Sequence, residues 1–275
     1  MSIKVLNNND KEVNVLHFQG KNVDILWRTF TLVKNYCELD PIEDYLSLVS
    51  CWTDNNNCYL YQQLKNNNIE LINALPYNYD YTQKWNMINK IKFYIDCLEN
   101  RVNTKYVMLL DGYDVLFTST KDILKKFKKT EYRIIFNTSY NNYPEEDIDY
   151  IENREEKLGF FHYFNAGCCI GYREDLIRFY KECLDFVYIY NPLQSEQKVL
   201  RHCFAKYSND KKQKFIWLDY KREIFHTMAL TTCSYDANTR ILKIDNNYEG
   251  DKIKRQNKKD LINTELTTNS ILSLN

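Results

Sequence analysis

Short apolar runs alternate along this chain with segments whose apolar residues recur at every third or fourth position. A short apolar run bounded by turn residues is typical of a strand, whereas recurrence at three or four positions is typical of a helix. The expected strands are residues 13–18, 45–53, 69–72, 106–111, 133–136, 168–172 and 215–218. The expected helices are residues 24–36, 58–64, 83–98 and 174–188. Strands that alternate with helices predict an α/β fold with a mostly parallel central sheet.

Residues 106–117 form the most informative segment, because two carboxylates, Asp111 and Asp114, appear at the end of an otherwise apolar run. Such runs belong to strands covered on both faces, and ligands of these sheets bind beyond the carboxyl ends of the strands. Carboxylates on a tight turn suit a hard divalent cation, which could clamp the phosphates of a nucleotide. The first candidate is therefore a metal-dependent nucleotide-sugar transferase.

Two other interpretations of the same segment stay open. In the first, the Asp-Gly pair makes an ordinary turn and Asp114 caps the element that follows. In the second, the chain is a phosphatase with an aspartate nucleophile. Haloacid dehalogenase-like phosphatases place their second acid two residues after the nucleophile, and the spacing of three between Asp111 and Asp114 disfavours that reaction.

Composition narrows the classes of partner. Lys plus Arg and Asp plus Glu number 37 each, so no long-range field favours nucleic acid, and we expect ligands to be recognised in a pocket. The first thirty residues show no signal-peptide pattern, and no run approaches eighteen apolar residues. We expect a soluble chain without a membrane span. The missing signal-peptide pattern favours the cytoplasm, which would be a host cytoplasm if the gene is viral, and entry into the secretory pathway with a partner stays open as the alternative. Whether it forms a homo-oligomer stays open.

Nine cysteines are scattered through apolar runs without a CxxC pair, so we expect them to be reduced and buried. No Gly/Ser/Pro-rich linker divides residues 1–275, which predicts a single domain. Residues 246–275 form a polar tail, and residues 145–157 are a highly charged stretch that we interpret as solvated.

Four ordered segments resemble the glycosyltransferase domain of the collagen lysyl hydroxylases, which is itself similar to glycosyltransferase family eight. They are Gln-Lys at 83–84, Leu-Asp-Gly-Tyr-Asp-Val at 110–115, Phe-Asn-Ala-Gly-Cys-Cys-Ile-Gly at 164–171, and Leu-Asp-Tyr-Lys at 218–221 followed by Ile-Phe at 224–225. The similarity runs from about residue 45 to residue 244 and implies a GT-A (Rossmann-like) fold. The resemblance implies only the sugar-transfer half of those enzymes, without the iron-dependent hydroxylase domain.

The resemblance also implies roles for single residues. In that family the acids at the positions of Asp111 and Asp114 bind Mn²⁺, and the tyrosine at Tyr113 stacks on uracil. The lysine at Lys84 helps to hold the nucleotide, and the strand that ends in Thr53 contacts it. An aromatic face that stacks on a base contributes about 1 to 3 kcal/mol, which agrees with the role of Tyr113.

Two further residues are candidates near the reacting groups. Asn165 opens the Asn-Ala-Gly segment, where small residues permit close approach of a ligand and an amide can bond sugar hydroxyls. Glu196 stands in a Ser-Glu-Gln segment where the family has Asp-Asp-Gln. We expect Asn165 and Glu196 to orient the donor sugar or the acceptor hydroxyl. The general base is not identified.

The third metal ligand of the family, a histidine near the C-terminal end of the domain, has no counterpart after His226. At the N-terminus, however, residues 17–21 read His-Phe-Gln-Gly-Lys and resemble the family eight His-Phe-x-Gly motif. His17 is then the expected metal ligand, and Gly20 and Lys21 are expected at the diphosphate. This interpretation makes the chain circularly permuted, with the metal-site strand and helix in residues 1–40 and the nucleotide-sugar and acceptor core in residues 45–244.

The combined expectation is a Mn²⁺-dependent transferase that moves glucose from UDP-glucose to galactosylhydroxylysine of a collagen-like polypeptide. One alternative is another hydroxylysine galactosyl- or glucosyltransferase. A different class is a UDP-sugar-binding protein with little transfer activity. That class stays open because Ser139 replaces a glutamate of the lysyl hydroxylase domain and Glu196 replaces an aspartate.

Overall fold

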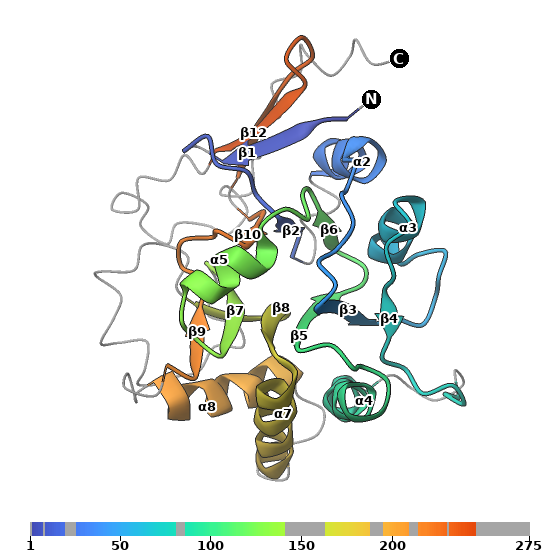
Figure 1. Ribbon diagram of the computed structural model, residues 1–275, viewed down its shortest axis with the longest axis vertical. Coiled ribbons are helices and arrows are strands. Elements are labelled where there is room, and N and C mark those ends of the chain that lie inside the picture. The colour runs from blue at the N-terminus through green and yellow to red at the C-terminus, as the bar shows by residue number, and fades with distance from the viewer. Residues whose placement is uncertain are drawn as a thin grey trace, which may run out of the picture.

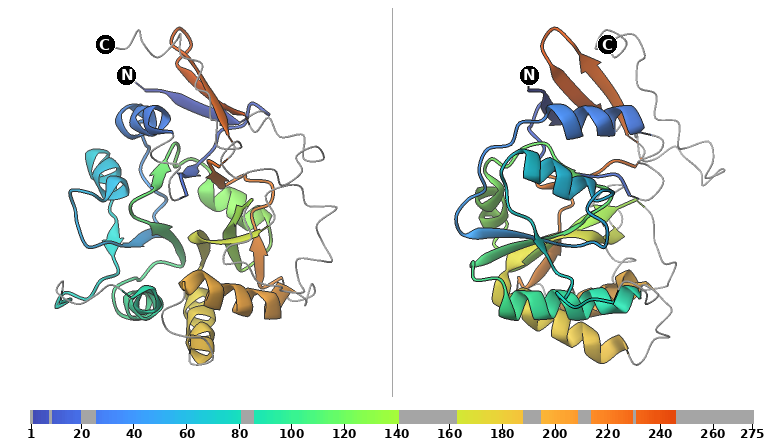
Figure 2. Two further views of the ribbon diagram at one scale, coloured as in Figure 1. Left: turned by 180° about the vertical axis from the view of Figure 1, so that it is seen from behind. Right: turned by 90° about the vertical axis from the view of Figure 1, so that its right-hand side faces the viewer.

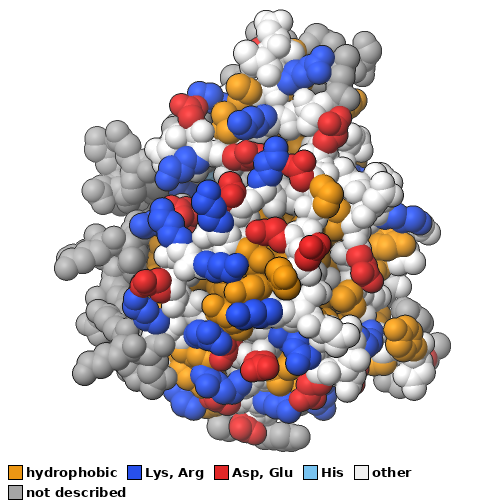
Figure 3. Space-filling model, viewed as in Figure 1, with side chains coloured by type: hydrophobic (Ala, Val, Ile, Leu, Met, Phe, Trp, Pro, Cys, Tyr) orange, Lys and Arg blue, Asp and Glu red, His pale blue; other side chains and the backbone are white. Residues whose placement is uncertain are grey.

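The computed structural model describes residues 2–7, 9–19, 26–80, 86–140, 163–187, 195–208, 214–229 and 231–245. These residues contain six helices and twelve strands arranged as a mixed α/β fold (Figure 1). None of the helices in these ranges combines the length and the apolar character that crossing a membrane requires. On the face drawn in Figure 3, Lys and Arg side chains are interspersed with Asp and Glu.

A six-stranded sheet forms the centre of the molecule. Its order is β4 (Ile72–Asn73), β3 (Leu46–Cys51), β5 (Tyr106–Asp111), β8 (Tyr163–Tyr172), β7 (Ile134–Ser139) and β9 (Ile216–Leu218). β3 is parallel to β4 and β5, β7 is parallel to β9, and β8 runs antiparallel to both of its neighbours. The prediction of a mostly parallel α/β sheet is therefore confirmed.

Helices cover both faces of this sheet (Figures 1 and 2). The helices of one layer are α4 (Met87–Asn100), α7 (Arg173–Val187) and α8 (Glu196–Ser208). The helices on the other side are α2 (Trp27–Tyr36), α3 (Tyr59–Asn66) and α5 (Ile123–Lys129). Alternate residues of β5 divide between the two cores: Met108 packs in one, whereas Val107 and Leu109 pack in the other. This two-sided burial explains why β5 is a continuous apolar run.

A second sheet connects the N-terminal segment to the acid-bearing turn. Its order is β10 (Phe225–Thr227), β2 (Val15–His17) and β6 (Val115–Phe117), with β2 parallel to β10 and antiparallel to β6. All three residues of β2 are buried. His17 pairs with Val115 on one side and with Thr227 on the other.

The third sheet brings the two ends of the described chain together. β1 (Lys4–Asn7) is parallel to β12 (Ile241–Asp245), which pairs in turn with β11 (Thr232–Asp236). The N-terminal and C-terminal strands therefore lie side by side, at the top of Figure 1.

Most predicted elements are present, with shifted ends. The helix expected from residue 83 begins at Met87, because the Asn86 side chain accepts a hydrogen bond from Ile88 N at 2.9 Å and caps the helix. The strand expected at residues 69–72 is the two-residue β4, and the strand expected to start at residue 168 starts at Tyr163. The charged stretch 145–157 and the tail 246–275 lie outside the described residues.

Two helices, α5 and α8, and five short strands, β1, β6, β10, β11 and β12, were not predicted. Strands of three to five residues are too short to show a clear period. The prediction for the cysteines is confirmed, since all nine are free and buried.

Candidate metal centre

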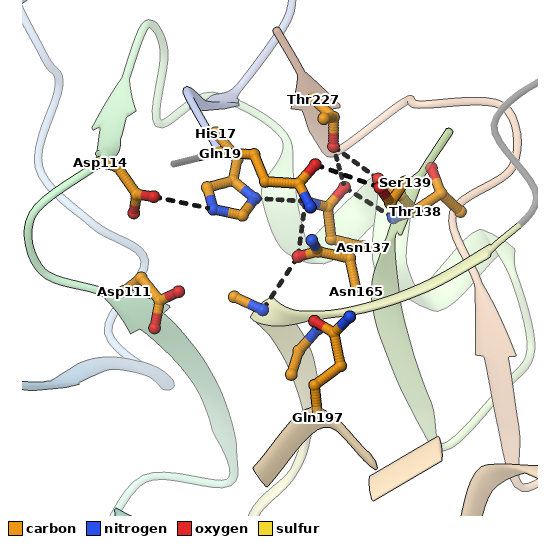
Figure 4. Close-up of polar contacts among 12 residues, drawn as sticks. His17, Gln19, Asp111, Asp114, Asn137, Thr138, Ser139, Asn165, Gln197 and Thr227 are labelled. Carbon is orange, nitrogen blue, oxygen red and sulfur yellow. Dashed lines mark hydrogen bonds and ion pairs between the residues drawn. The ribbon is translucent and has the colours of Figure 1, made fainter. Parts of the chain in front are cut away.

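His17, Asp111 and Asp114 lie together at the carboxyl end of β5 (Figure 4). Each residue offers one ligand atom, and these atoms lie within 4.8 Å of one another. His17 Nε2 is 3.4 Å from Asp114 Oδ2. Across the described ranges, no other group of three or more His, Cys, Asp or Glu side chains has this geometry. The structure thus brings together the three residues that the sequence nominated as ligands.

The main chain fixes this arrangement. Asp111 ends β5, Asp114 directly precedes β6, and His17 ends β2, which pairs with β6. Phe18 N donates a hydrogen bond to Asp114 O at 2.8 Å, and Met228 N donates one to His17 O at 2.9 Å. His17 is therefore attached on one side to the loop that carries the acids and on the other to the segment that follows β10.

The electrostatics of the cluster follow from burial and from the acids. The His17 side chain is 3% exposed, and burial by itself opposes its protonation. The negative charge of Asp114 and its hydrogen bond act in the opposite direction, together with the charge of Asp111, and the pKa of His17 is raised. Because Asp111 and Asp114 stabilise positive charge at this position, the same charges would also attract a cation.

The residues fit a divalent cation both by chemistry and by space. Two carboxylates and one imidazole are a ligand set suited to Mn²⁺ and related first-row ions. Gly167, on β8, lies against this set. A Cβ added to Gly167 would be 2.6 Å from His17 Cε1 and 2.8 Å from Asp111 Oδ2. Any other residue at this position would press into the space between two of the candidate ligands.

Lys90 is a member of the site that the sequence analysis missed. It lies on α4, its side chain is 8% exposed, and Nζ forms ion pairs with Asp111 and, at 3.3 Å, with Glu196 Oε1. Burial lowers the pKa of Lys90, but the charge of Asp111 and further contacts outweigh burial and hold that pKa well above its ordinary value. The helical spacing could have indicated this position, because residues four apart lie on the same face of a helix and Lys90 precedes the buried Tyr94 by four.

Asn165 and Glu196 lie close to this cluster, and their side chains already have partners. Asn165 Oδ1 accepts from Gly167 N at 2.9 Å, and Glu196 is bound to Lys90. Gln197, next to Glu196, accepts from Ala166 N at 3.2 Å through Oε1. The Ser-Glu-Gln and Asn-Ala-Gly segments are thus joined, as an orienting role requires, while that role itself stays a prediction.

Thr53 and Tyr113 are also brought together. Thr53 N donates to the Tyr113 hydroxyl at 3.1 Å, and the two hydroxyl oxygens are 3.1 Å apart. The Tyr113 residue is 41% exposed, so its ring is accessible to a ligand. The other predicted nucleotide contacts, Gly20, Lys21 and Lys84, lie outside the described residues.

A mostly parallel sheet with acids and a candidate cation site beyond the carboxyl end of a central strand is the architecture of a GT-A glycosyltransferase. A family model described as the PLOD GT domain matches residues 79–262, about two thirds of the chain. The chain belongs to this family, and the resemblance to the glycosyltransferase domain of the collagen lysyl hydroxylases is confirmed. Thr53 and His17 lie outside the matched region. A search of the curated proteins found no match.

We expect Gly167→Ala to weaken binding of Mn²⁺ by at least about 10-fold, since the added methyl group displaces His17 or Asp111 from the site. Electron paramagnetic resonance of free Mn²⁺ measures this affinity. Gly171→Ala is the matched control on the same strand: its Cβ would meet Arg133 O at 3.0 Å and Leu176 Cγ at 3.1 Å, so it strains the core away from the cluster. Equal Mn²⁺ affinity in Gly167→Ala and the parent protein would contradict the assignment of the site.

We expect Lys90→Met to lower the free energy of unfolding by about 3 kcal/mol, because it leaves Asp111 and the buried Glu196 without their shared cation. Urea denaturation measures the change, and Lys92→Met, at an exposed position of the same helix, is the control. Added Mn²⁺ should restore part of the loss, since a bound cation again balances Asp111. If the two variants unfolded at the same urea concentration, Lys90 would have no structural role in the site.

Proposed function

We propose that this chain is a Mn²⁺-dependent glycosyltransferase that takes glucose from UDP-glucose and transfers it to galactosylhydroxylysine of a collagen-like polypeptide. The observation that carries the proposal is the convergence of His17, Asp111 and Asp114 at one sheet edge in a member of the PLOD GT domain family. Membership of this family supports a collagen-type acceptor. The choice of UDP-glucose as the donor goes beyond the family and is part of the proposal.

The charge balance of the site supports a divalent cation. Asp111 and Glu196 both pair with Lys90, which supplies one positive charge, and the third carboxylate, Asp114, contacts His17. Two negative charges then remain among these side chains when His17 is neutral. Uncompensated charge at partly buried positions is costly, and a divalent ion would neutralise it.

In this proposal each residue has a specific task. His17, Asp111 and Asp114 would hold the ion, which would offset the charge that develops on the departing UDP. Lys90 holds Asp111 and Glu196 in a fixed relation. Tyr113 would stack on the uracil ring, with Thr53 fixing its hydroxyl. The retained carboxylate of Glu196 and the amide of Asn165 would orient the donor sugar or the acceptor hydroxyl.

The proposal includes a circular permutation, in which the N-terminal segment supplies the ligand that the family places near its C-terminal end. Two contacts support it: β2, with His17, lies directly between β6 and β10, and β1 pairs with β12. Ends that lie side by side make such a rearrangement geometrically simple. We assign residues 1–275 to one glycosyltransferase domain on this basis.

The experiment that tests the function is release of UDP from UDP-glucose, with and without a hydroxylysine-containing collagen peptide that carries galactose. We expect release to require Mn²⁺ and to fall by about 100-fold or more in His17→Ala, Asp111→Ala and Asp114→Ala, because each removes stabilisation of the leaving group. Asp122→Ala removes an exposed acid outside the site and should have no effect. Full turnover in excess EDTA would refute the metal-dependent reaction. Binding of UDP-glucose without release of UDP would favour the binding-protein alternative.

A second test addresses nucleotide recognition. We expect Tyr113→Ala to weaken UDP binding by about 1 to 3 kcal/mol, the contribution of a base stacked on an aromatic ring. Tyr113→Phe should lose less, since it keeps the ring and removes only the hydroxyl that contacts Thr53. Tyr77→Ala, at a residue that is 96% exposed, is the control. Calorimetric titration with UDP measures all three, and equal losses in the alanine and phenylalanine variants would show that the stacking role is wrong.

A further inference from the structure

The imidazole of His17 has a second polar partner on the side away from the acids. Asn137, on β7, is fully buried, and its Nδ2 lies 3.2 Å from His17 Nδ1 (Figure 4). His17 therefore lies between Asp114 at Nε2 and Asn137 at Nδ1. Side chains in this position usually decide which ring nitrogen of a histidine carries hydrogen.

Backbone N–H groups determine which end of the Asn137 amide faces the ring. Asn137 Oδ1 accepts a hydrogen bond from Thr138 N at 2.8 Å. Asn137 Nδ2 lies 3.5 Å from Asn165 Oδ1, an oxygen that accepts from Gly167 N at 2.9 Å. A backbone N–H can only donate, so the atoms that accept from Thr138 N and Gly167 N must be the amide oxygens of Asn137 and Asn165. The nitrogen end of the Asn137 amide is thus left to face His17.

This arrangement conflicts with cation binding. When Asn137 donates to Nδ1, neutral His17 carries its hydrogen on Nε2, the nitrogen that faces Asp114. A cation bound by Nε2 needs the lone pair of that nitrogen, with the hydrogen on Nδ1 and a hydrogen-bond acceptor as its partner. The present orientation of Asn137 offers a donor there instead.

We propose that Asn137 is a positioning residue that acts through His17. Its amide favours the imidazole form that cannot bind a cation. Binding of a cation therefore requires the amide to flip, so that Oδ1 and Nδ2 exchange places. The proposal rests on the proposed function, since it takes His17 as the cation ligand. After the flip, Oδ1 would accept from His17 Nδ1, while Thr138 N would lose its acceptor. An unsatisfied buried N–H is unfavourable, so Asn137 weakens cation binding.

Asn137→Asp removes this conflict with almost no change of shape. One carboxylate oxygen still accepts from Thr138 N, and the other can accept from His17 Nδ1, which completes the carboxylate–histidine–metal arrangement. We expect this variant to bind Mn²⁺ about 10-fold more tightly than the parent protein. Gln197→Glu controls for the added charge, because it also places a carboxylate beside the Asn-Ala-Gly segment but contacts Ala166 N instead of His17.

The test combines two measurements on the full chain. The first is the nitrogen-15 NMR spectrum of the metal-free parent protein with labelled histidine, at alkaline pH where the imidazole is neutral. The chain has four histidines, and the His17 signals are those missing from His17→Gln. We expect the hydrogen on Nε2 in the parent and on Nδ1 in Asn137→Asp. The second measurement is the Mn²⁺ affinity of the parent, Asn137→Asp and Gln197→Glu by electron paramagnetic resonance.

The outcomes separate this inference from the proposed function. A parent spectrum with the hydrogen on Nδ1 would overturn the inference, and this result does not depend on whether the variant folds. Mn²⁺ binding in Asn137→Asp that is no tighter than in Gln197→Glu would overturn it as well. Failure of the cation site on which the proposed function rests would look different, because none of the three proteins would then bind Mn²⁺, and failure of sugar transfer alone would leave both measurements unchanged.

Discussion

The insertion of β2 between β6 and β10 is the constraint on which the candidate site depends. β6 begins directly after Asp114, so pairing with β6 fixes the distance between His17 and the acid-bearing turn. Pairing with β10 prevents β2 from moving away, because the two strands share a parallel ladder. The ligand positions are thus set by main-chain hydrogen bonds in a buried sheet, which is a more rigid support than a surface loop would provide.

Much of this site could be predicted from local pattern, and the exceptions share one cause. Asp111 and Asp114 interrupt a continuous apolar strand, and such a strand in an α/β sheet delivers its last residues to a ligand edge. His17 has no such local signal and was identified only through resemblance to a family motif. Lys90 and Asn137 were missed, because their roles arise from contacts with residues distant in the chain. Periodicity reports which face a residue occupies but not what lies opposite.

The same limit explains the differences in the fold. The pattern predicted the long buried strands well, but β8 begins five residues before its apolar run. The added part of the strand includes the polar Asn165, which pairs with Asn137 just beyond a register shift in the β7–β8 ladder. This irregularity places the Asn-Ala-Gly segment against His17 and Asp111, where Gly167 leaves room for them. A departure from regular pairing therefore coincides with the site. Local rules are expected to fail at functional positions of this kind.

The topology also couples the site to the two ends of the described chain. His17 follows β1 closely in sequence, and β1 is held by β12, near the other end. Asp111 ends a strand of the central sheet and Asp114 directly precedes β6 of the second sheet, so the three ligands meet only when β2 has paired with β6. Contacts between such distant segments form late when loop closure must precede them. Assembly of the cation site would then report on the pairing of β2 with β6, whereas the central sheet that delivers Asp111 depends on contacts of its own.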